Sequence, residues 1–172
     1  MQKRIAVPTA ISSLRLLALP PFLYLFHLND TTACLILVAF CAATDFLDGY
    51  AARRLNAASR FGAYYDAATD FAFVMGVFSV FYVVGYYPLW LLLLIAASFA
   101  QFLITSLYTK KLYDPVGRYL GSALYIGIAL TLIAPTQAIF IFVEVAFAGF
   151  FVVSVASRIL SLTRKQAELT LN

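Results

Sequence analysis

Six long apolar segments follow one another along this chain, and they constrain its fold more than any other feature. Each is close to the roughly twenty residues that a helix needs to cross the hydrocarbon core of a bilayer. By residue number they are about 8–28, 31–53, 60–84, 87–109, 116–134 and 136–160. Hydrophobic residues make up 63% of the chain and charged residues 12%, whereas soluble domains are roughly 25% charged. A soluble interior could not hold this much apolar surface, so we expect an integral membrane protein.

Short breaks separate the segments, at Asn29-Asp30, near Asn56, at Gly85 to Pro88, at Tyr113 to Pro115 and at Pro135-Thr136. Helices are the expected spans, because a bilayer offers no water to unpaired backbone groups and the sequence lacks the alternating short strands of a barrel. We therefore predict an all-α integral membrane protein with six transmembrane helices in one bundle. The whole chain, 1–172, is expected to form a single domain.

The basic residues predict the orientation of this bundle. One set of helix ends carries Lys3, Arg4, Arg53, Arg54, Arg60, Lys110, Lys111, Arg118, Arg158, Arg164 and Lys165. The opposite ends, around Asn29, Tyr86 and Thr136, carry no Lys or Arg, and Tyr86, Tyr87 and Trp90 there predict an interfacial aromatic belt. By the positive-inside rule, both termini and the site described below face the cytoplasm, in the cytoplasmic membrane. The net charge of +4 then reflects topology and anionic lipid headgroups, and no nucleic-acid partner is expected.

Four of the eight acidic residues lie within one stretch of 26 residues. Asp45 and Asp48 are three residues apart and Asp66 and Asp70 four apart, so each pair projects from one face of a helix. If the second and third segments form an antiparallel hairpin turning near Ala57, all four carboxylates meet at one level. Carboxylates gathered in a low-dielectric place take up protons or a cation. Their hard oxygens favour Mg²⁺ or Mn²⁺, and one His and two Cys leave little for a zinc site.

The same stretch follows the pattern D-x2-D-G-x2-A-R-x8-G-x3-D-x3-D. Its glycines, Gly49 and Gly62, allow a ligand to approach a helix backbone closely. Arg53, which follows Ala52, is suited to a phosphate oxygen. Eight positions in one register form a specific signal. The pattern resembles the signature of the CDP-alcohol phosphotransferase family at all eight positions, and the six-segment layout extends this resemblance over nearly the whole chain.

The resemblance implies a divalent-metal-dependent enzyme of phospholipid synthesis. It would move a phosphatidyl or archaetidyl group from a CDP-linked lipid to an acceptor alcohol and release CMP. One or two Mg²⁺ or Mn²⁺ ions would be held by Asp45, Asp48, Asp66 and Asp70. The general base for the acceptor hydroxyl would be Asp70. The residues lining the CDP-lipid pocket would be Gly49, Ala52, Arg53 and Gly62. The resemblance also suggests a homodimer.

The first segment carries a second, shorter match. Residues Pro8 to Arg15 resemble the P-N-x-[IL]-[ST]-x-x-R opening of the phosphatidylglycerophosphate synthase branch, with Thr9 in place of the usual Asn. We therefore add Pro8 and Thr9 to the expected CDP-lipid pocket. For Arg15 two roles are expected equally, contact with a phosphate or a side chain that snorkels to the headgroups.

The acceptor is expected near basic residues at the cytoplasmic ends of the last three segments, namely Lys110, Lys111, Arg118 and Arg158. Membrane anchoring is their alternative role. Similar residues in the inositol-phosphate branch of the family bind the acceptor's phosphate, which favours a phosphorylated acceptor. The run TDFLDGYAARR resembles members that use glycerol phosphate, although Ala67 and Phe71 replace the Pro and Lys of their D-P-x-A-D-K. We favour sn-glycerol 3-phosphate, with inositol phosphate second and serine third.

A divalent-cation carrier is the alternative of another class, because intramembrane carboxylates also mark ion pathways. The four carboxylates are expected near one face of the membrane, and no relay of acidic residues continues through the remaining depth of the bilayer. Gly49, Ala52, Arg53 and Gly62 would serve no purpose in a carrier. The sequence therefore favours the transferase.

Overall fold

The computed structural model describes residues 2–54, 60–109 and 117–170, and the side-chain environments of residues 13–44, 62, 64–104 and 121–157. The helices in these residues are α1 (Gln2–His27), α2 (Thr31–Arg54), α3 (Arg60–Val83), α4 (Leu89–Thr109), α5 (Gly117–Ile133) and α6 (Gln137–Thr170). No strand occurs in the described ranges. The all-α prediction is confirmed, and each apolar segment contains one helix. α1 begins earlier than its segment, and α6 continues past its segment into a more polar tail.

The turns described between helices lie where the sequence predicted breaks. After α1, Asn29 adopts a φ of 57°, a left-handed conformation that Asn tolerates better than most residues. Asp30 follows, and its Oδ1 accepts a hydrogen bond of 3.0 Å from the backbone N–H of Ala33, which caps the first turn of α2. Between α3 and α4, Gly85 has a φ of 87°, which glycine adopts without steric cost.

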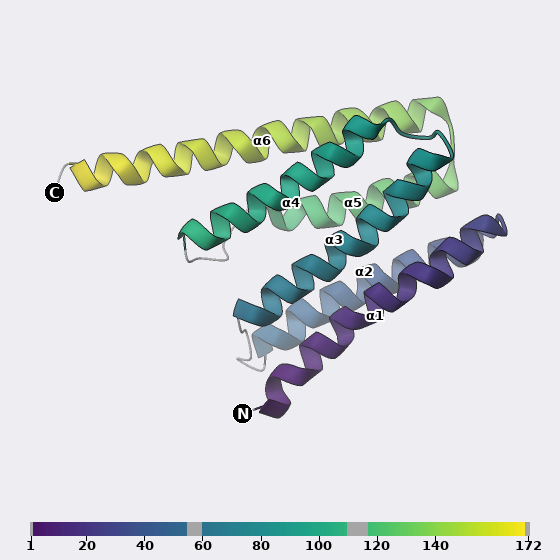
Figure 1. The fold of residues 1–172 in the computed structure, drawn as a ribbon, viewed down its shortest axis with the longest axis horizontal. Helices are drawn as coiled ribbons and strands as arrows, with labels where there is room; N and C mark the ends of the chain where they lie inside the picture. The colour runs from purple at the N-terminus through teal and green to yellow at the C-terminus, as the bar shows by residue number, and fades with distance from the viewer. Residues whose placement is uncertain (1, 55–59, 110–116, 171–172) are drawn as a thin grey trace.

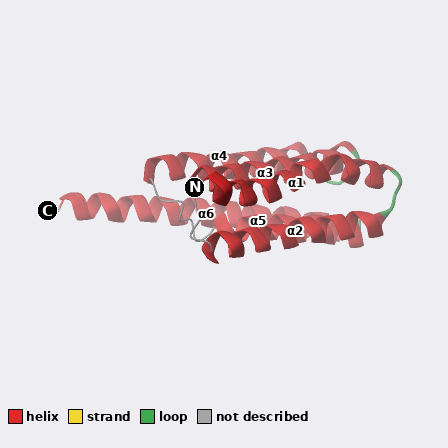
Figure 2. Ribbon diagram, turned by 90° about the horizontal axis from the view of Figure 1, so that it is seen from below, coloured by secondary structure: helices red, strands yellow, loops and turns green. Residues whose placement is uncertain are grey.

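The helices form two layers of three, seen edge-on in Figure 2. One layer contains α1, α3 and α4 and the other α2, α5 and α6, with α1 on α2, α3 on α5 and α4 on α6 across the interface. Successive helices run antiparallel, so the first residues of α1, α3 and α5 lie at the same end as the last residues of α2, α4 and α6 (Figure 1). We call this the terminal end. The tail of α6 extends there beyond the other helices.

α1 lies at one edge of its layer, beside both helices that carry the acidic stretch. It packs extensively on both α2 and α3, whereas α2 and α3 lie in different layers and pack on each other much less over the described residues. The two helices run antiparallel, as the predicted hairpin requires, although they lie in different layers. α1 can approach α3 closely because Gly76 lies at their contact, where an added Cβ would be 2.6 Å from Leu19 Cδ1.

An aromatic core fills the end of the bundle opposite the terminal end. Phe78 is completely buried, and its ring lies 5.5 Å from the ring of Tyr87 and 6.0 Å from that of Phe147. Tyr87 is 2% exposed and its hydroxyl forms a hydrogen bond of 2.5 Å with Thr131. The predicted aromatic belt is thus wrong for Tyr87, whose hydroxyl finds a partner inside the fold. Trp90 is exposed, as a belt residue would be.

Two stretches in the described part of the chain are long and apolar enough to cross a membrane, Tyr64–Val83 and Gln137–Ser157. Shorter apolar helical stretches are Thr31–Thr44, Leu89–Ile104 and Gly121–Ile133. Large apolar side chains cover the outside of the bundle, among them Leu17, Ile36, Val83, Ile133 and Val145. An outer surface of this kind indicates contact with lipid.

The close approach of α1 to α3 predicts the effect of a branched side chain at Gly76. In Gly76→Val, the added methyl groups would occupy the volume of the Leu19 side chain, and overpacking of this kind destabilises by about 1–3 kcal/mol. We expect a lower midpoint of thermal unfolding in detergent. The matched control is Gly149→Ala on α6, where an added Cβ meets nothing within 4 Å. It should leave the midpoint unchanged or raise it slightly, because Ala favours helix over Gly. Equal midpoints for both variants would contradict the close packing.

Candidate active site

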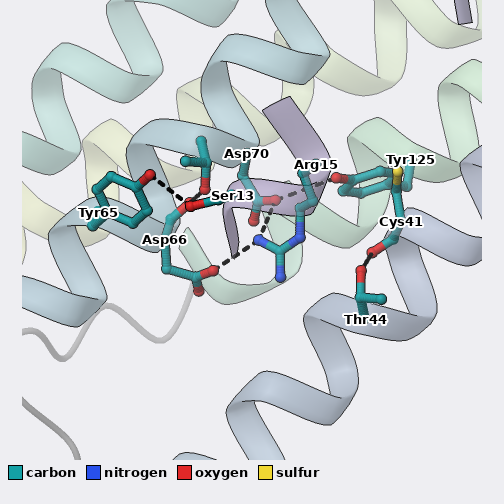
Figure 3. A network of polar contacts seen from close by, with 9 residues as sticks. Ser13, Arg15, Cys41, Thr44, Tyr65, Asp66, Asp70 and Tyr125 are labelled. Carbon is teal, nitrogen blue, oxygen red and sulfur yellow. Dashed lines mark hydrogen bonds and ion pairs between the residues drawn. The ribbon is translucent and has the colours of Figure 1, made fainter. Parts of the chain in front are cut away.

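A buried arginine lies at the centre of a polar cluster between α1 and α3. The side chain of Arg15 is completely buried. Its Nη1 donates hydrogen bonds to Asp66 Oδ1 at 2.7 Å and to Asp70 Oδ1 at 2.6 Å (Figure 3). A charged group without solvent is stable only if it is paired and hydrogen-bonded. The two carboxylates therefore permit Arg15 to lie inside the bundle.

Asp66 and Asp70 meet at this arginine because they lie one helical turn apart on α3 and share its α1 face. Their oxygens converge on one nitrogen atom, so both carboxylates reach the same point in space. Their side chains remain 34% and 24% exposed, whereas Arg15 has no exposed surface. The cluster is closed on the arginine side and open on the carboxylate side.

Side chains from other helices complete the cluster. Tyr125 on α5 is 6% exposed, and its hydroxyl donates a hydrogen bond of 3.2 Å to Asp70 Oδ1. The ring of Phe73 stacks on that of Tyr125, with the centroids 6.0 Å apart. On α2, Cys41 is 1% exposed and lies beside the cluster in Figure 3. Four helices therefore surround the two carboxylates.

A second hydrogen bond ties α1 to α3 beside the ion pairs. Ser13 Oγ and the hydroxyl of Tyr65 are 2.8 Å apart (Figure 3). On α3 itself, Thr69 Oγ1 donates to the backbone carbonyl of Asp66 at 2.8 Å. The bond between Ser13 and Tyr65 therefore adds to the Arg15 contacts in holding the two helices in one register at the site.

The structure brings together part of the predicted site and leaves the rest untested. Asp66 and Asp70 are adjacent, and Gly62 is half-buried one turn earlier on the same helix. Helical positions with side chains outside the described set are Asp45, Asp48, Gly49, Ala52 and Arg53 on α2, Pro8 and Thr9 on α1, Arg118 on α5 and Arg158 on α6. Lys110 and Lys111 lie outside the described residues.

Sequence reasoning missed two partners of the carboxylates. Arg15 was expected to contact a phosphate or to snorkel, and its complete burial against Asp66 and Asp70 rules out snorkelling. An arginine inside an apolar segment needs an acidic partner, and this rule could have predicted the pairing. Tyr125 was missed altogether. It lies in an apolar run with no spacing that marks it.

The arrangement suits a divalent cation. Among the described side chains, no group of three or more His, Cys, Asp or Glu residues gathers in one place, and the side chains of Asp45 and Asp48 are outside that set. The pair that is described has the required geometry, since Asp66 and Asp70 already direct one oxygen each at a single positive atom. Carboxylate oxygens are the ligands that Mg²⁺ prefers. These two residues therefore fit a metal site.

Fold and site together define an all-helical membrane protein with paired carboxylates that suit a cation. The family profile for CDP-alcohol phosphatidyltransferases matches residues 5–160. The chain belongs to this family, which is in general dependent on divalent metals. The family resemblance predicted from the signature is confirmed.

Curated relatives share one name, CDP-diacylglycerol–glycerol-3-phosphate 3-phosphatidyltransferase. The protein from Pseudomonas fluorescens is 38% identical over 103 residues, which cover 58% of this chain and 52% of that protein. Those from Yersinia enterocolitica and Pectobacterium atrosepticum are 36% and 35% identical over 95 residues, which cover 54% of this chain and 51% of each relative. The chain thus spans about half the length of the curated relatives it matches. No solved structure matches the chain.

The ion pairs of Arg15 predict a stability effect of Asp70. Without added metal, in EDTA, Asp70→Asn should lower the midpoint of thermal unfolding, because Arg15 keeps its burial and loses one counter-charge. A hydrogen bond to a charged group contributes about 1.5–3 kcal/mol. The matched control is Asp30→Asn, at an exposed cap where Asn serves as well as Asp. A midpoint for Asp70→Asn equal to that of the control would show that the pair contributes nothing to stability.

Proposed function

We propose that this protein transfers a phosphatidyl or archaetidyl group from a CDP-linked lipid to sn-glycerol 3-phosphate and releases CMP. The relatives' names mention CDP-diacylglycerol and glycerol 3-phosphate, and the family match supports the reaction type. The observation that carries the proposal is the convergence of Asp66 and Asp70, the last two acids of the signature, on one cationic atom inside a helical membrane domain. Inositol phosphate and then serine are the alternative acceptors.

We infer that all six helices cross the cytoplasmic membrane, with both termini and the site facing the cytoplasm. The support is the distribution of charge. At or near the terminal end lie basic residues of every helix except α4, including Arg4, Arg54, Arg60, Arg118 and Arg158. The turns at the other end carry no Lys or Arg. A lipid headgroup and a water-soluble acceptor can meet at such an interface, and lipid surrounds the outer faces.

For the metal, we propose that Asp45, Asp48, Asp66 and Asp70 hold one or two Mg²⁺ or Mn²⁺ ions. Bound there, the metal would neutralise charge on the diphosphate of the CDP-linked lipid. The partial exposure of Asp66 and Asp70 supports this role, because the diphosphate can reach them. Asp45 and Asp48 are included because they belong to the signature. They lie on α2, and α1 packs on both α2 and α3.

The chemical step needs a base for the acceptor hydroxyl, and we assign it to Asp70. The carboxylate of Asp70 takes the proton of the acceptor hydroxyl as the hydroxyl oxygen attacks the phosphorus next to the lipid. The bond from that phosphorus to the CMP oxygen breaks, and CMP leaves. Tyr125 positions Asp70 through its hydrogen bond. Because positioning contributes most of the rate in phosphoryl transfer, a fixed carboxylate suits this role.

The remaining site residues are assigned by the signature and by location. The CDP-lipid pocket would comprise Gly49, Ala52, Arg53, Gly62, Pro8 and Thr9, which lie on α1, α2 and the start of α3. The phosphate of the acceptor would be bound by Lys110, Lys111, Arg118 and Arg158. We also propose a homodimer, which the family resemblance suggests.

The reaction is tested by CMP release from CDP-diacylglycerol and glycerol 3-phosphate in detergent with Mg²⁺. We expect Asp70→Asn to lower kcat by about 10²–10⁴-fold, the usual contribution of a general base. The Asp66→Asn variant, and the wild type in EDTA, should have no turnover. Asp30→Asn should match the wild type, because Asp30 lies in an exposed turn at the other end. Divalent-cation flux into vesicles without CMP release would favour a carrier instead.

The acceptor is tested with a panel of alcohols and one substitution. Glycerol 3-phosphate should give the highest kcat/KM among glycerol 3-phosphate, inositol phosphate and serine. Arg158→Ala should raise the KM of the phosphorylated acceptor about tenfold or more, because a charged hydrogen bond is lost, and leave the KM of the CDP-linked lipid nearly unchanged. Arg164→Ala, further along the tail of α6, is the control. Equal effects of Arg158→Ala on both KM values would remove it from the acceptor pocket.

A further inference from the structure

The position of Arg15 is the feature that the reaction leaves unexplained. Its Nη1 lies 2.7 Å from Asp66 Oδ1 and 2.6 Å from Asp70 Oδ1. These two oxygens converge on one point, so together they form a pair that could bind one metal ion. Arg15 is also the only Lys or Arg among the side chains that the structure describes. A positive charge from the protein itself therefore neutralises the carboxylates that the reaction assigns to a cation.

The guanidinium and a divalent ion cannot share these oxygens in the same geometry. Mg²⁺ binds carboxylate oxygens at about 2.1 Å, so an ion between Asp66 Oδ1 and Asp70 Oδ1 would take the place of Nη1. Two cations this close repel strongly in a site with little water. Binding of the ion to both of these oxygens must break at least one of the two contacts that Arg15 makes.

We propose that Arg15 is an exchangeable counter-cation of Asp66 and Asp70, which a divalent ion displaces when it binds. When no ion is bound, Arg15 keeps the two carboxylates from repelling each other and holds α1 against α3. When an ion binds, the guanidinium withdraws from at least one carboxylate. It remains beside the ion, where it can form an ion pair with an anionic diphosphate.

Two features of the cluster support this exchange. The carboxylates are partly exposed, with 34% and 24% of their side chains accessible, so an ion can reach them. The bonds from Ser13 to Tyr65 and from Tyr125 to Asp70 do not involve the guanidinium. They tie α1 and α5 to α3 independently, so the helices stay together while the guanidinium moves.

The proposed exchange predicts that Arg15 weakens metal binding. Because the ion has to displace a bound cation, its affinity is lower than that of the same carboxylates without Arg15. Arg15→Gln keeps a polar side chain and removes the charge. In this variant Mn²⁺, added alone and followed by electron paramagnetic resonance, should bind about tenfold more tightly than in the wild type, or better. An affinity equal to or weaker than that of the wild type would overturn the proposal.

Tyr125→Phe is the matched control for this measurement. It removes one hydrogen bond to the same Asp70 oxygen and changes no charge, so its Mn²⁺ affinity should stay within about twofold of the wild type. Arg15→Lys keeps a positive charge and should lie closer to the wild type than Arg15→Gln does. If Tyr125→Phe tightened binding as much as Arg15→Gln, the effect would come from loosening of the site, and the exchange would be refuted.

Thermal unfolding in detergent gives a second readout that needs no turnover. In EDTA, Arg15→Gln should unfold at a lower temperature than the wild type, since its carboxylates repel without a counter-charge. Mg²⁺ should raise the midpoint of Arg15→Gln more than that of the wild type. Equal shifts in both proteins would contradict the exchange.

A structure of the wild-type protein with Mn²⁺ tests the exchange even if Arg15→Gln does not fold. The expected result is an ion bound to Asp66 and Asp70, with Arg15 Nη1 more than 4 Å from at least one of them. Retention of both contacts beside a bound ion would overturn the proposal.

This inference rests on the metal assignment in the proposed function, and the two fail differently. CMP release without any Mn²⁺ binding would remove the metal assignment and the exchange together, while the transferase would stand. Mn²⁺ binding with unchanged Arg15 contacts would remove the exchange alone.

Discussion

An arginine sealed inside the bundle, with its charge balanced by two carboxylates, is the interaction on which this structure depends. Arg15 has no exposed surface, so its charge is stable only where Asp66 and Asp70 meet it. This requirement sets the register of α1 against α3. Gly76 permits the close approach of the two helices further along, and the Ser13–Tyr65 bond supports the same register. Packing and charge therefore specify one arrangement.

The two ends of the bundle have different tasks. At the end opposite the termini, Phe78 and Tyr87 lie in a closed aromatic core, and the hydroxyl of Tyr87 is satisfied by Thr131. Toward the terminal end, the polar cluster of Arg15, Asp66 and Asp70 lies between the helices, and the carboxylates are partly open to solvent. A rigid closed core at one end can support a site that must admit ions and headgroups at the other.

The cluster also links the two roles proposed for Asp70. Its Oδ1 accepts bonds from both Arg15 and Tyr125, so this oxygen is committed while the guanidinium is in place. In the proposed exchange, withdrawal of the guanidinium would release this oxygen when a metal ion binds.

The sequence by itself determined the class of fold, the helix breaks and the family. Apolar runs of membrane length, turns such as those at Asn29 and Gly85, and the spacing of Asp66 and Asp70 are local properties, and local rules read them correctly. Only the tertiary structure decided that α1 packs on both α2 and α3, that Tyr87 belongs to the core, and that Arg15 and Tyr125 bind the carboxylates. The contacts of Arg15 and Tyr125 with the carboxylates join residues more than fifty positions apart, and apolar periodicity does not encode which helix neighbours which. The buried charge of Arg15 favours a packing that pairs it with carboxylates, and this pairing exists only in the folded protein.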